Sequence, residues 1–449
     1  MKKYSAIILS LLLILLTFTA CRKNISDDKD GKIEDEKANA TLDFAALESA
    51  YGSEMWEKIA DAFEAENEGI TVKVTTSKTI EDVLSPQMKA GDYPDVVHLA
   101  TGREKALTET LTKEKALEDI SDVLKMTVPG EAVTVEEKLL DGFTDTLITK
   151  PYGDGKLYLA PMFYSPCGLF YNKNLFEQKG WSVPETWDEM WELGDKAKEN
   201  NISLFTYPTS GYFDSFFYAL LASQGNSDFY NSALTYKEGI WDSDEAKNAL
   251  NIIGKLKDYT EPTTVSNANN ENYLKNQQLI LDNKALFMPN GTWVKGEMED
   301  APTAENFEWG FAPLPASEKG GDRYSYTFFE QMWIPKNAKN KDLAKKFIAF
   351  MYSDKAAKIF ADEGDAVAVQ PIKGVAKFLD EDEREIYSVY DNGVKAAMGS
   401  FASTKPVEGV SIFDEVFSAI DSVISGETTV DVWRARIAKA SDKLREAMK

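Results

Sequence analysis

Residues 161–187 read PMFYSPCGLFYNKNLFEQKGWSVPETW, and this stretch decides the fold. The apolar run at 168–172 predicts a short β-strand, and the next residues predict a helix that ends at Gly180. Thr186 predicts the start of a second helix, because Glu189 follows three residues later at the spacing of a capping box. The stretch therefore predicts a strand, a helix, a turn and another helix in direct succession.

The chain is long and acidic. Its 449 residues are enough for two domains, and its hydrophobic fraction of 43% is ordinary for a globular protein. The formal net charge of −24 argues against nucleic acid as a partner, since phosphate binding requires clusters of Lys and Arg. The same charge argues against electrostatic docking on anionic lipid and indicates mainly high solubility.

The N-terminus has the pattern of an export signal. Two lysines precede an apolar run at 6–16, which is too short to span a membrane as a stable helix. The Phe-Thr-Ala-Cys run that ends at Cys21 resembles a bacterial lipobox, although Phe18 stands where Leu is usual; an ordinary secretory signal is the alternative. We expect a lipoprotein signal peptide at 1–21 ending in the lipidated Cys21, and a disordered polar tether at 22–40.

Residue types suited to covalent or metal chemistry are few. If Cys21 carries lipid, the only other cysteine, Cys167, has no partner and the exported protein has no disulfide. Cys167 stands in an apolar run and is expected to be a small buried residue. His98, the single histidine, stands inside a strand pattern and is expected to be packed rather than to bind a ligand.

The region after the tether predicts a parallel β-sheet. A strand at 41–46, a helix with apolar residues at helical spacing over 55–63, and a strand at 70–74 form a βαβ unit. A further helix at 80–90 and a buried strand at 95–100 continue the pattern. Ligands bind at the carboxyl ends of strands in open α/β sheets, so the loops after 41–46 and 95–100 are candidates for a binding site.

Several motifs, taken in order, resemble the family 1 extracellular solute-binding proteins of ABC transporters, the maltose-binding-protein-like group. The main resemblance is the crossover into the second lobe, carried by Tyr171, Asn172, Lys173, Leu175, Phe176, Gly180, Pro184 and Thr186 to Glu189. Other matches are the strand and loop at 284–293, the second crossover at 309–315 and the helix that starts near 340. The resemblance covers the chain from about residue 41 to the C-terminus.

This resemblance implies an α/β fold with two lobes, the type II periplasmic-binding-protein-like fold. Three hinge crossovers would join the lobes, and a ligand cleft would lie between them. The expected N-terminal lobe comprises residues 41–161 and 313–352, and the expected C-terminal lobe comprises residues 162–312 and 353–449.

The resemblance also implies where a sugar would bind. Aromatic faces cover the C–H patches of pyranose rings, while carboxylate, guanidinium and amide groups pair with the hydroxyl groups. Charged and polar candidates come from the loops at the carboxyl ends of strands, and aromatic candidates come from the crossover and the second lobe. One further candidate of each kind comes from the cleft edge of the expected strand at 328–335. The candidate ligand-binding residues are Glu48, Thr101, Gly102, Arg103, Tyr164, Tyr212, Trp293, Glu330, Trp333 and Phe413.

The implied function is capture of an oligosaccharide or disaccharide, without bond chemistry, and its delivery to an ABC transporter permease. An amino-sugar such as N-acetylglucosamine or its dimer is one possibility. A single histidine argues against His-based triads and most metal sites, and no catalytic motif is present. We expect no cofactor and no metal, a monomer, and contact with the membrane through the N-terminal lipid only. The alternatives are a secreted carbohydrate-active hydrolase, which needs only two carboxylates, an exported scaffold, or a family 1 binder of a non-sugar solute.

Overall fold

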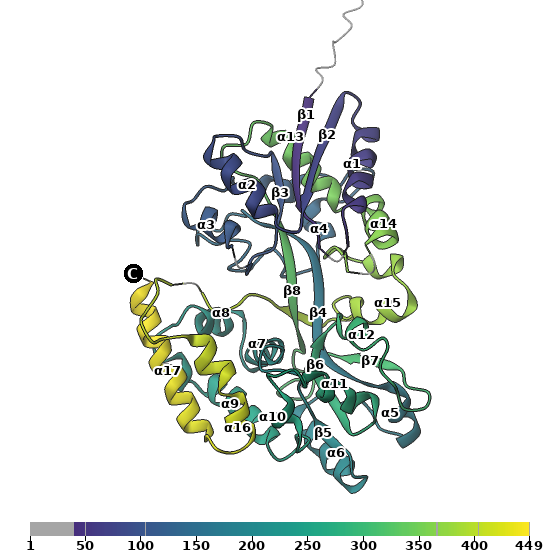
Figure 1. Ribbon diagram of the computed structural model, residues 1–449, viewed down its shortest axis with the longest axis vertical. Helices are drawn as coiled ribbons and strands as arrows, with labels where there is room; N and C mark the ends of the chain where they lie inside the picture. Colours follow the sequence, from purple (N-terminus) through teal and green to yellow (C-terminus); the bar gives the residue numbers. More distant parts are fainter. Residues whose placement is uncertain (1–39, 50, 104, 365–366, 403, 449) are drawn as a thin grey trace, which may run out of the picture. The chain divides into compact units, whose positions relative to one another are not determined.

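The computed structural model describes residues 40–49, 51–103, 105–364, 367–402 and 404–448 (Figure 1). The expected signal peptide, the lipidation site Cys21 and residues 22–39 of the tether lie outside these residues. Within the described ranges, no helix is both long enough and apolar enough to cross a membrane.

The described residues alternate between strands and helices. The strands are β1 (Ala40–Leu47), β2 (Ile70–Ser77), β3 (Val96–His98), β4 (Ala160–Asn172), β5 (Ser203–Phe205), β6 (Ala285–Gly291), β7 (Trp309–Ala312), β8 (Tyr324–Trp333) and β9 (Lys395–Ala397). The α-helices are α1 (Glu54–Glu66), α2 (Ile80–Lys89), α3 (Leu107–Lys113), α4 (Val135–Lys138), α5 (Lys173–Lys179), α6 (Trp187–Glu199), α7 (Phe213–Gln224), α8 (Ser227–Leu234), α9 (Asp244–Leu256), α10 (Thr264–Asn267), α11 (Tyr273–Leu281), α12 (Val294–Glu297), α13 (Lys341–Met351), α14 (Asp354–Glu363), α15 (Glu381–Tyr387), α16 (Ile420–Ile424) and α17 (Val430–Ala447).

The strands form one sheet in the order β2-β1-β3-β8-β4-β6-β5, with β7 also paired to β4 and β9 to β8. The β1–β2 and β1–β3 pairs are parallel, which confirms the predicted βαβ unit. The β3–β8, β8–β4 and β4–β6 pairs are antiparallel. The β5–β6 and β8–β9 pairs are parallel again, so the sheet is mixed, with parallel pairs near both of its edges and an antiparallel centre.

The antiparallel pair of β4 and β8 joins two apolar cores (Figure 1). On β4, Phe163 belongs to the core built around α1 and α13, whereas Leu169 belongs to the core built around α6 and α7. On β8, Phe329 belongs to the first of these cores and Tyr324 to the second. Both strands therefore leave one core and enter the other, as hinge strands do.

The crossing points differ from those expected. The sequence placed the return to the first core at residue 313, but Leu314 and Tyr324 still pack in the second core, because β8 itself is the returning strand. The sequence also placed everything after residue 352 in the second lobe. Instead α14 packs on α1, and the ring of Phe360 lies 5.7 Å from that of Trp56, since the apolar face of α14 completes the first core.

The quoted stretch folds largely as predicted. It contains the C-terminal part of β4, then α5, which ends at Gly180 in the left-handed region, and the start of α6. The Thr186 side chain accepts a hydrogen bond from the backbone N–H of Glu189, so the predicted cap is confirmed. Glu189 reaches back to the backbone N–H of Glu185 instead of to Thr186. Cys167 on β4 is buried and unpaired.

A buried carboxylate, Asp95, fixes the first core. It is 2% exposed, and its two oxygens accept hydrogen bonds from the backbone N–H groups of Asp43, Lys339 and Asn340 at 2.8–3.1 Å and from the Asn340 side chain at 3.0 Å. These donors lie on β1 and on the approach to α13. One side chain therefore joins the first strand to a segment that lies 245 residues after Asp95 in the sequence.

We expect Asp95→Ala to lower the free energy of unfolding by about 3 kcal/mol or more, because four N–H groups lose a charged acceptor in a buried place. Asp95→Asn, which keeps one acceptor oxygen, should have an intermediate effect. Urea unfolding measures both. The matched control is Asp92→Ala at a 72% exposed carboxylate, which should change the value by less than about 0.5 kcal/mol. Equal stability of the Asp95 and Asp92 variants would contradict this assignment.

Candidate ligand-binding site

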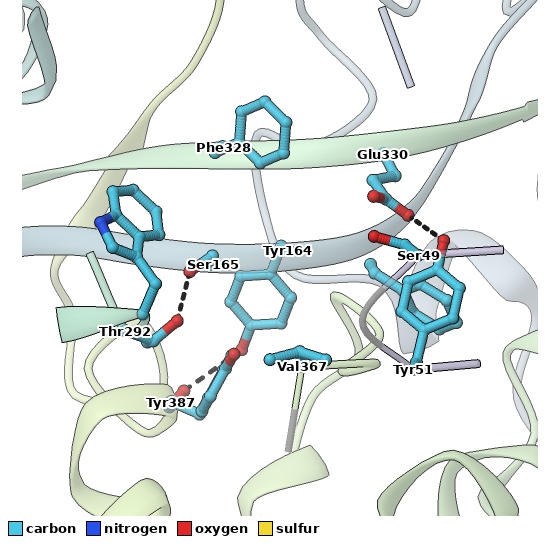
Figure 2. Close-up of a pocket in the computed structure, with 11 residues that line it drawn as sticks. Ser49, Tyr51, Tyr164, Ser165, Thr292, Phe328, Glu330, Val367 and Tyr387 are labelled. Carbon is cyan, nitrogen blue, oxygen red and sulfur yellow. Dashed lines mark hydrogen bonds between the residues drawn. The ribbon is translucent and has the colours of Figure 1, made fainter. Parts of the chain in front are cut away.

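A pocket of about 400 Å³ lies over the β4–β8 pair (Figure 2). Its lining comes from the loop after β1, from β4 and β8, from the segment after β6, and from the chain between α14 and the end of α15. The lining residues are Ser49, Tyr51, Phe163, Tyr164, Ser165, Thr292, Trp293, Phe328, Glu330, Val367 and Tyr387. The pocket is therefore largely aromatic, with hydroxyl groups and one carboxylate as its polar groups.

Glu330 supplies the carboxylate. Its Oε2 accepts a hydrogen bond of 2.9 Å from the Tyr51 hydroxyl, and the Nε2 atom of His98 lies 3.0 Å from the same oxygen. Burial, together with the negative charge of Glu330, raises the pKa of Tyr51 well above its ordinary value, so that hydroxyl remains a donor. His98 is fully buried, as predicted, and its ring packs against those of Trp56 and Phe163.

Trp293 supplies an aromatic wall. A Cβ atom at Gly291 would overlap the indole, so glycine at that position lets the ring lie directly on the backbone. The ring of Tyr212 lies 5.7 Å away, edge to face, and its hydroxyl donates a 2.7 Å hydrogen bond to Glu297. Tyr212 thus supports Trp293 from behind without lining the pocket. On the neighbouring strand, Ser165 bonds to Thr292 at 2.6 Å (Figure 2).

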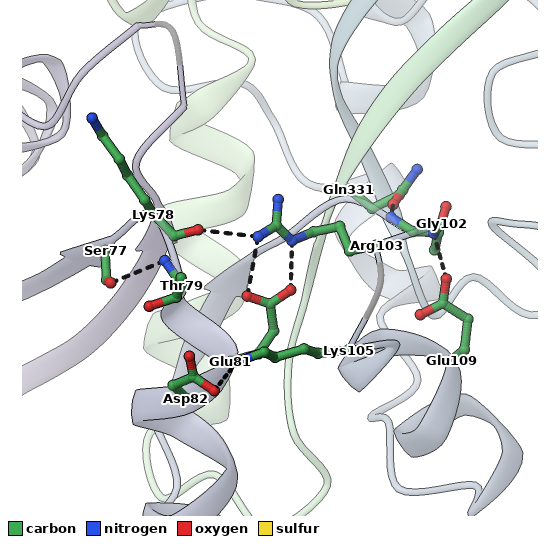
Figure 3. A network of polar contacts seen from close by, with 11 residues as sticks. Ser77, Lys78, Thr79, Glu81, Asp82, Gly102, Arg103, Lys105, Glu109 and Gln331 are labelled. Carbon is green, nitrogen blue, oxygen red and sulfur yellow. Dashed lines mark hydrogen bonds and ion pairs between the residues drawn. The ribbon is translucent and has the colours of Figure 1, made fainter.

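The loop after β3 is held by a polar network (Figure 3). Arg103 donates through Nε and Nη2 to the two oxygens of Glu81 and also through Nη2 to the carbonyl of Lys78, at 2.5–3.2 Å. Burial alone would raise the pKa of Glu81, but Arg103 outweighs it and holds that pKa below its ordinary value. The backbone N–H of Thr101 donates to Gln331 on β8. This network fixes the loop to α2 and to β8.

The structure brings three of the predicted site residues, Tyr164, Trp293 and Glu330, together in the lining of the pocket. Glu48 precedes the lining residue Ser49 but does not itself line the pocket. Thr101, Gly102 and Arg103 belong to the loop network rather than to the lining, and Gly102 donates its N–H to Glu109.

Two aromatic candidates lie elsewhere. Trp333 was expected at the cleft edge, and this is wrong: its side chain is fully buried in a core with Val97 and Leu117, on the face of β8 opposite to Glu330. Phe413 is 48% exposed and its ring contacts that of Phe417, away from the pocket lining.

Most of the lining residues were not predicted from the sequence. Phe328 could have been found, because it stands two residues before Glu330 on a strand and so shares its face. Tyr51 stands in the loop after 41–46, which was considered, but it was not singled out there. Val367 and Tyr387 carry no such local signal, since tertiary packing alone brings them to the pocket.

A second carboxylate, Asp214, lies near the same strand pair. It stands in the first turn of α7. Burial is the main cause that raises the pKa values of Tyr326 on β8 and Cys167 on β4, and the charge of Asp214 is the second cause in both. Burial raises the pKa of Asp214 itself to about 7, although the backbone N–H of Ser215 acts in the opposite direction. None of the described cationic side chains offsets this shift.

In the part of the chain that the structure describes, no group of three or more His, Cys, Asp or Glu side chains is placed to hold a metal ion.

Two apolar cores that are joined by a pair of strands, with a pocket over that pair, are the arrangement of a receptor for a small solute. Residues 45–358 match the family described as bacterial extracellular solute-binding protein. The chain belongs to this family.

Curated relatives resemble the chain over most of its length. The diacetylchitobiose binding protein NgcE of Streptomyces coelicolor is 23% identical, over 95% of this chain and 92% of its own. The galactooligosaccharide-binding protein of Bacillus subtilis is 25% identical, over 90% of this chain and 91% of its own. Among solved structures, the bacterial solute receptor AcbH superposes with a TM-score of 0.71 at 16% identity, covering 91% of this chain and all of that one. The fold is therefore that of the two-lobed solute receptors.

We expect the ionisation of Asp214 to destabilise the protein. Between about pH 4 and pH 7 the unfolded carboxyl loses its proton while the folded one keeps it, so the free energy of unfolding falls as pH rises and levels off above pH 7. A gap of about three pKa units corresponds to at most about 4 kcal/mol. In Asp214→Asn this pH-dependent loss should disappear, as measured by urea unfolding from pH 4 to pH 8. Asp228→Asn, at an exposed carboxylate in the first turn of α8, is the control and should follow the wild type. An Asp214→Asn profile parallel to that of the wild type would contradict the assignment.

Proposed function

We propose that the protein captures a carbohydrate outside the cytoplasm and delivers it to the permease of an ABC importer. The observation that carries this proposal is the pocket itself: aromatic side chains surround a few hydroxyl groups and one carboxylate, over the two hinge strands. Aromatic rings suit the C–H faces of a pyranose, and hydroxyl and carboxylate oxygens suit its hydroxyl groups. The names of the relatives, which include binders of diacetylchitobiose and galacto-oligosaccharides, support the same class of ligand.

In this proposal the protein binds its sugar and leaves the bonds intact. Two lobes close on the ligand by bending at β4 and β8, so that groups from both lobes reach it. The polar loop residues Glu48, Thr101, Gly102 and Arg103 and the aromatic residues Tyr212 and Phe413 then serve as contacts in the closed form, in addition to the pocket lining. The protein acts as a monomer and needs no cofactor.

The proposal includes a lipid anchor at Cys21, supported by the lipobox-like run that ends there. Cys21→Ser should abolish incorporation of labelled palmitate in cells and release the protein from the membrane fraction, because position 21 then has no thiol to take the diacylglyceryl group. Cys167→Ser is the matched control and should still be labelled. Labelling that persists in Cys21→Ser would contradict the anchor.

The proposed function is tested by a thermal-shift screen of the purified protein against diacetylchitobiose, a galacto-oligosaccharide, galactose and maltotriose. A ligand that binds only the folded state at 100 times its Kd stabilises it by about 2.7 kcal/mol, so one sugar group should raise Tm clearly. Trp293→Ala should lose most of this shift while its Tm without sugar changes little. Trp181→Ala, at a half-buried indole outside the pocket, is the control and should retain the shift.

The outcomes separate the alternatives. A Tm shift with the sugar recovered intact supports the proposal. Cleavage of the sugar, seen by thin-layer chromatography, would instead indicate a hydrolase. No shift with any sugar would indicate a solute of another class.

A further inference from the structure

The cleft-facing side of β8 carries two residues whose local environments are unusual for a folded strand. Phe328 is 45% exposed, and among the described residues its ring contacts no other aromatic side chain. Glu330 lies two positions further on, on the same face, and also lines the pocket. Figure 2 shows both side chains at the pocket, on the same strand.

Glu330 has one occupied and one unoccupied oxygen. Both of its close neighbours, the Tyr51 hydroxyl at 2.9 Å and His98 Nε2 at 3.0 Å, lie against Oε2. Within the described residues, Oε1 accepts no hydrogen bond, and no Lys or Arg forms an ion pair with this carboxylate. The His98 ring nitrogens also lack a well-directed hydrogen bond. A partly buried carboxylate oxygen of this kind is free to accept a hydrogen bond from a ligand.

Phe328 complements this acceptor. Its phenyl ring is exposed on a strand that is otherwise mostly buried, and it lines the pocket, so an apolar ligand face can cover it. Residues two apart on a strand lie roughly 6.6 Å apart and point to the same face, so both side chains reach the same pocket. One strand face therefore offers both contacts that fix the orientation of a sugar.

Resting on the proposed function, we propose that Phe328 and Glu330 are the specificity-determining pair of the site, and that the ligand is an uncharged sugar lying against the hinge strand. Phe328 takes the C–H face of the sugar and Oε1 of Glu330 accepts from one of its donors. Tyr51 is a positioning residue, which holds Oε2 so that Oε1 faces the ligand. Among the described lining residues Glu330 is the only carboxylate, and it repels sugars that carry a negative charge.

The test is isothermal titration calorimetry with four probes, diacetylchitobiose, a galacto-oligosaccharide, galactose and maltotriose, and with the acidic sugars galacturonate and glucuronate. For any neutral probe that binds, Phe328→Ala should weaken binding about tenfold or more, and Phe328→Tyr, which keeps the ring, should stay within about threefold. Glu330→Gln should weaken it by about tenfold. Phe378→Ala, at a half-buried ring away from the pocket lining, is the matched control and should bind as the wild type does.

Tyr51 is tested through its dependence on Glu330. Tyr51→Phe should weaken binding about three- to fivefold in the wild-type background and have little further effect in Glu330→Gln. A merely structural role would give the same loss in both backgrounds. Tyr207→Phe removes a comparable buried hydroxyl–carboxylate hydrogen bond, to Asp421 at 2.6 Å, and serves as the control for lost stability without lost affinity.

Failure of this inference differs from failure of the proposed function. If a neutral sugar binds the wild type and Phe328→Ala or Glu330→Gln binds it equally well, the specificity pair is wrong and the receptor function stands. Tight binding of an acidic sugar would overturn the charge selection. If none of the neutral sugars binds, the proposed function fails and the inference fails with it.

Discussion

The antiparallel hydrogen bonding between β4 and β8 is the constraint on which the rest of the described structure depends. The two strands pair over residues that lie in two different apolar cores, with one shift of register between Pro161 and Tyr164. A backbone ladder of this kind resists sliding, because any slip by one residue would turn every side chain to the opposite face. The pair therefore fixes which residues form the floor of the site.

The pocket follows from this arrangement. The carboxyl end of β1 brings Tyr51 to the floor, the segment after β6 brings Trp293, and β8 supplies Phe328 and Glu330. Each contribution is locally supported: Glu330 by the Tyr51 hydroxyl, Trp293 by glycine at 291 and by the edge of Tyr212. A site whose walls are held by hydrogen bonds and ring packing loses little conformational entropy when a ligand arrives.

Local sequence patterns correctly predicted those features that depend on residues close together in the chain. The βαβ unit, the cap at Thr186, the turn at Gly180 and the burial of Cys167 follow from periodicity, hydrogen bonding and residue size, and all are confirmed. The strand β8 shows both the strength and the failure of such reasoning. Glu330 and Trp333 were assigned to one edge, yet a spacing of three places them on opposite faces of a strand. Packing over long sequence distances, which brings α14 onto α1 and Tyr387 to the pocket, leaves no local pattern to read.

The partners of the buried and half-buried carboxylates differ, and this difference separates those with a structural role from the one with a proposed binding role. Asp95 is surrounded by four N–H donors, and Glu81 is paired with Arg103, so each is fully compensated inside the fold. Glu330 forms no close ion pair with a described Lys or Arg, although Arg103 interacts with it electrostatically, and its Oε1 accepts no hydrogen bond from the described residues. A partly buried carboxylate with an unused oxygen can accept a hydrogen bond from a ligand without losing one inside the protein. Phe328 lies on the same strand face and adds an apolar surface beside this acceptor. An acceptor and an apolar ring on one strand face are therefore stronger grounds for a binding role than either residue alone.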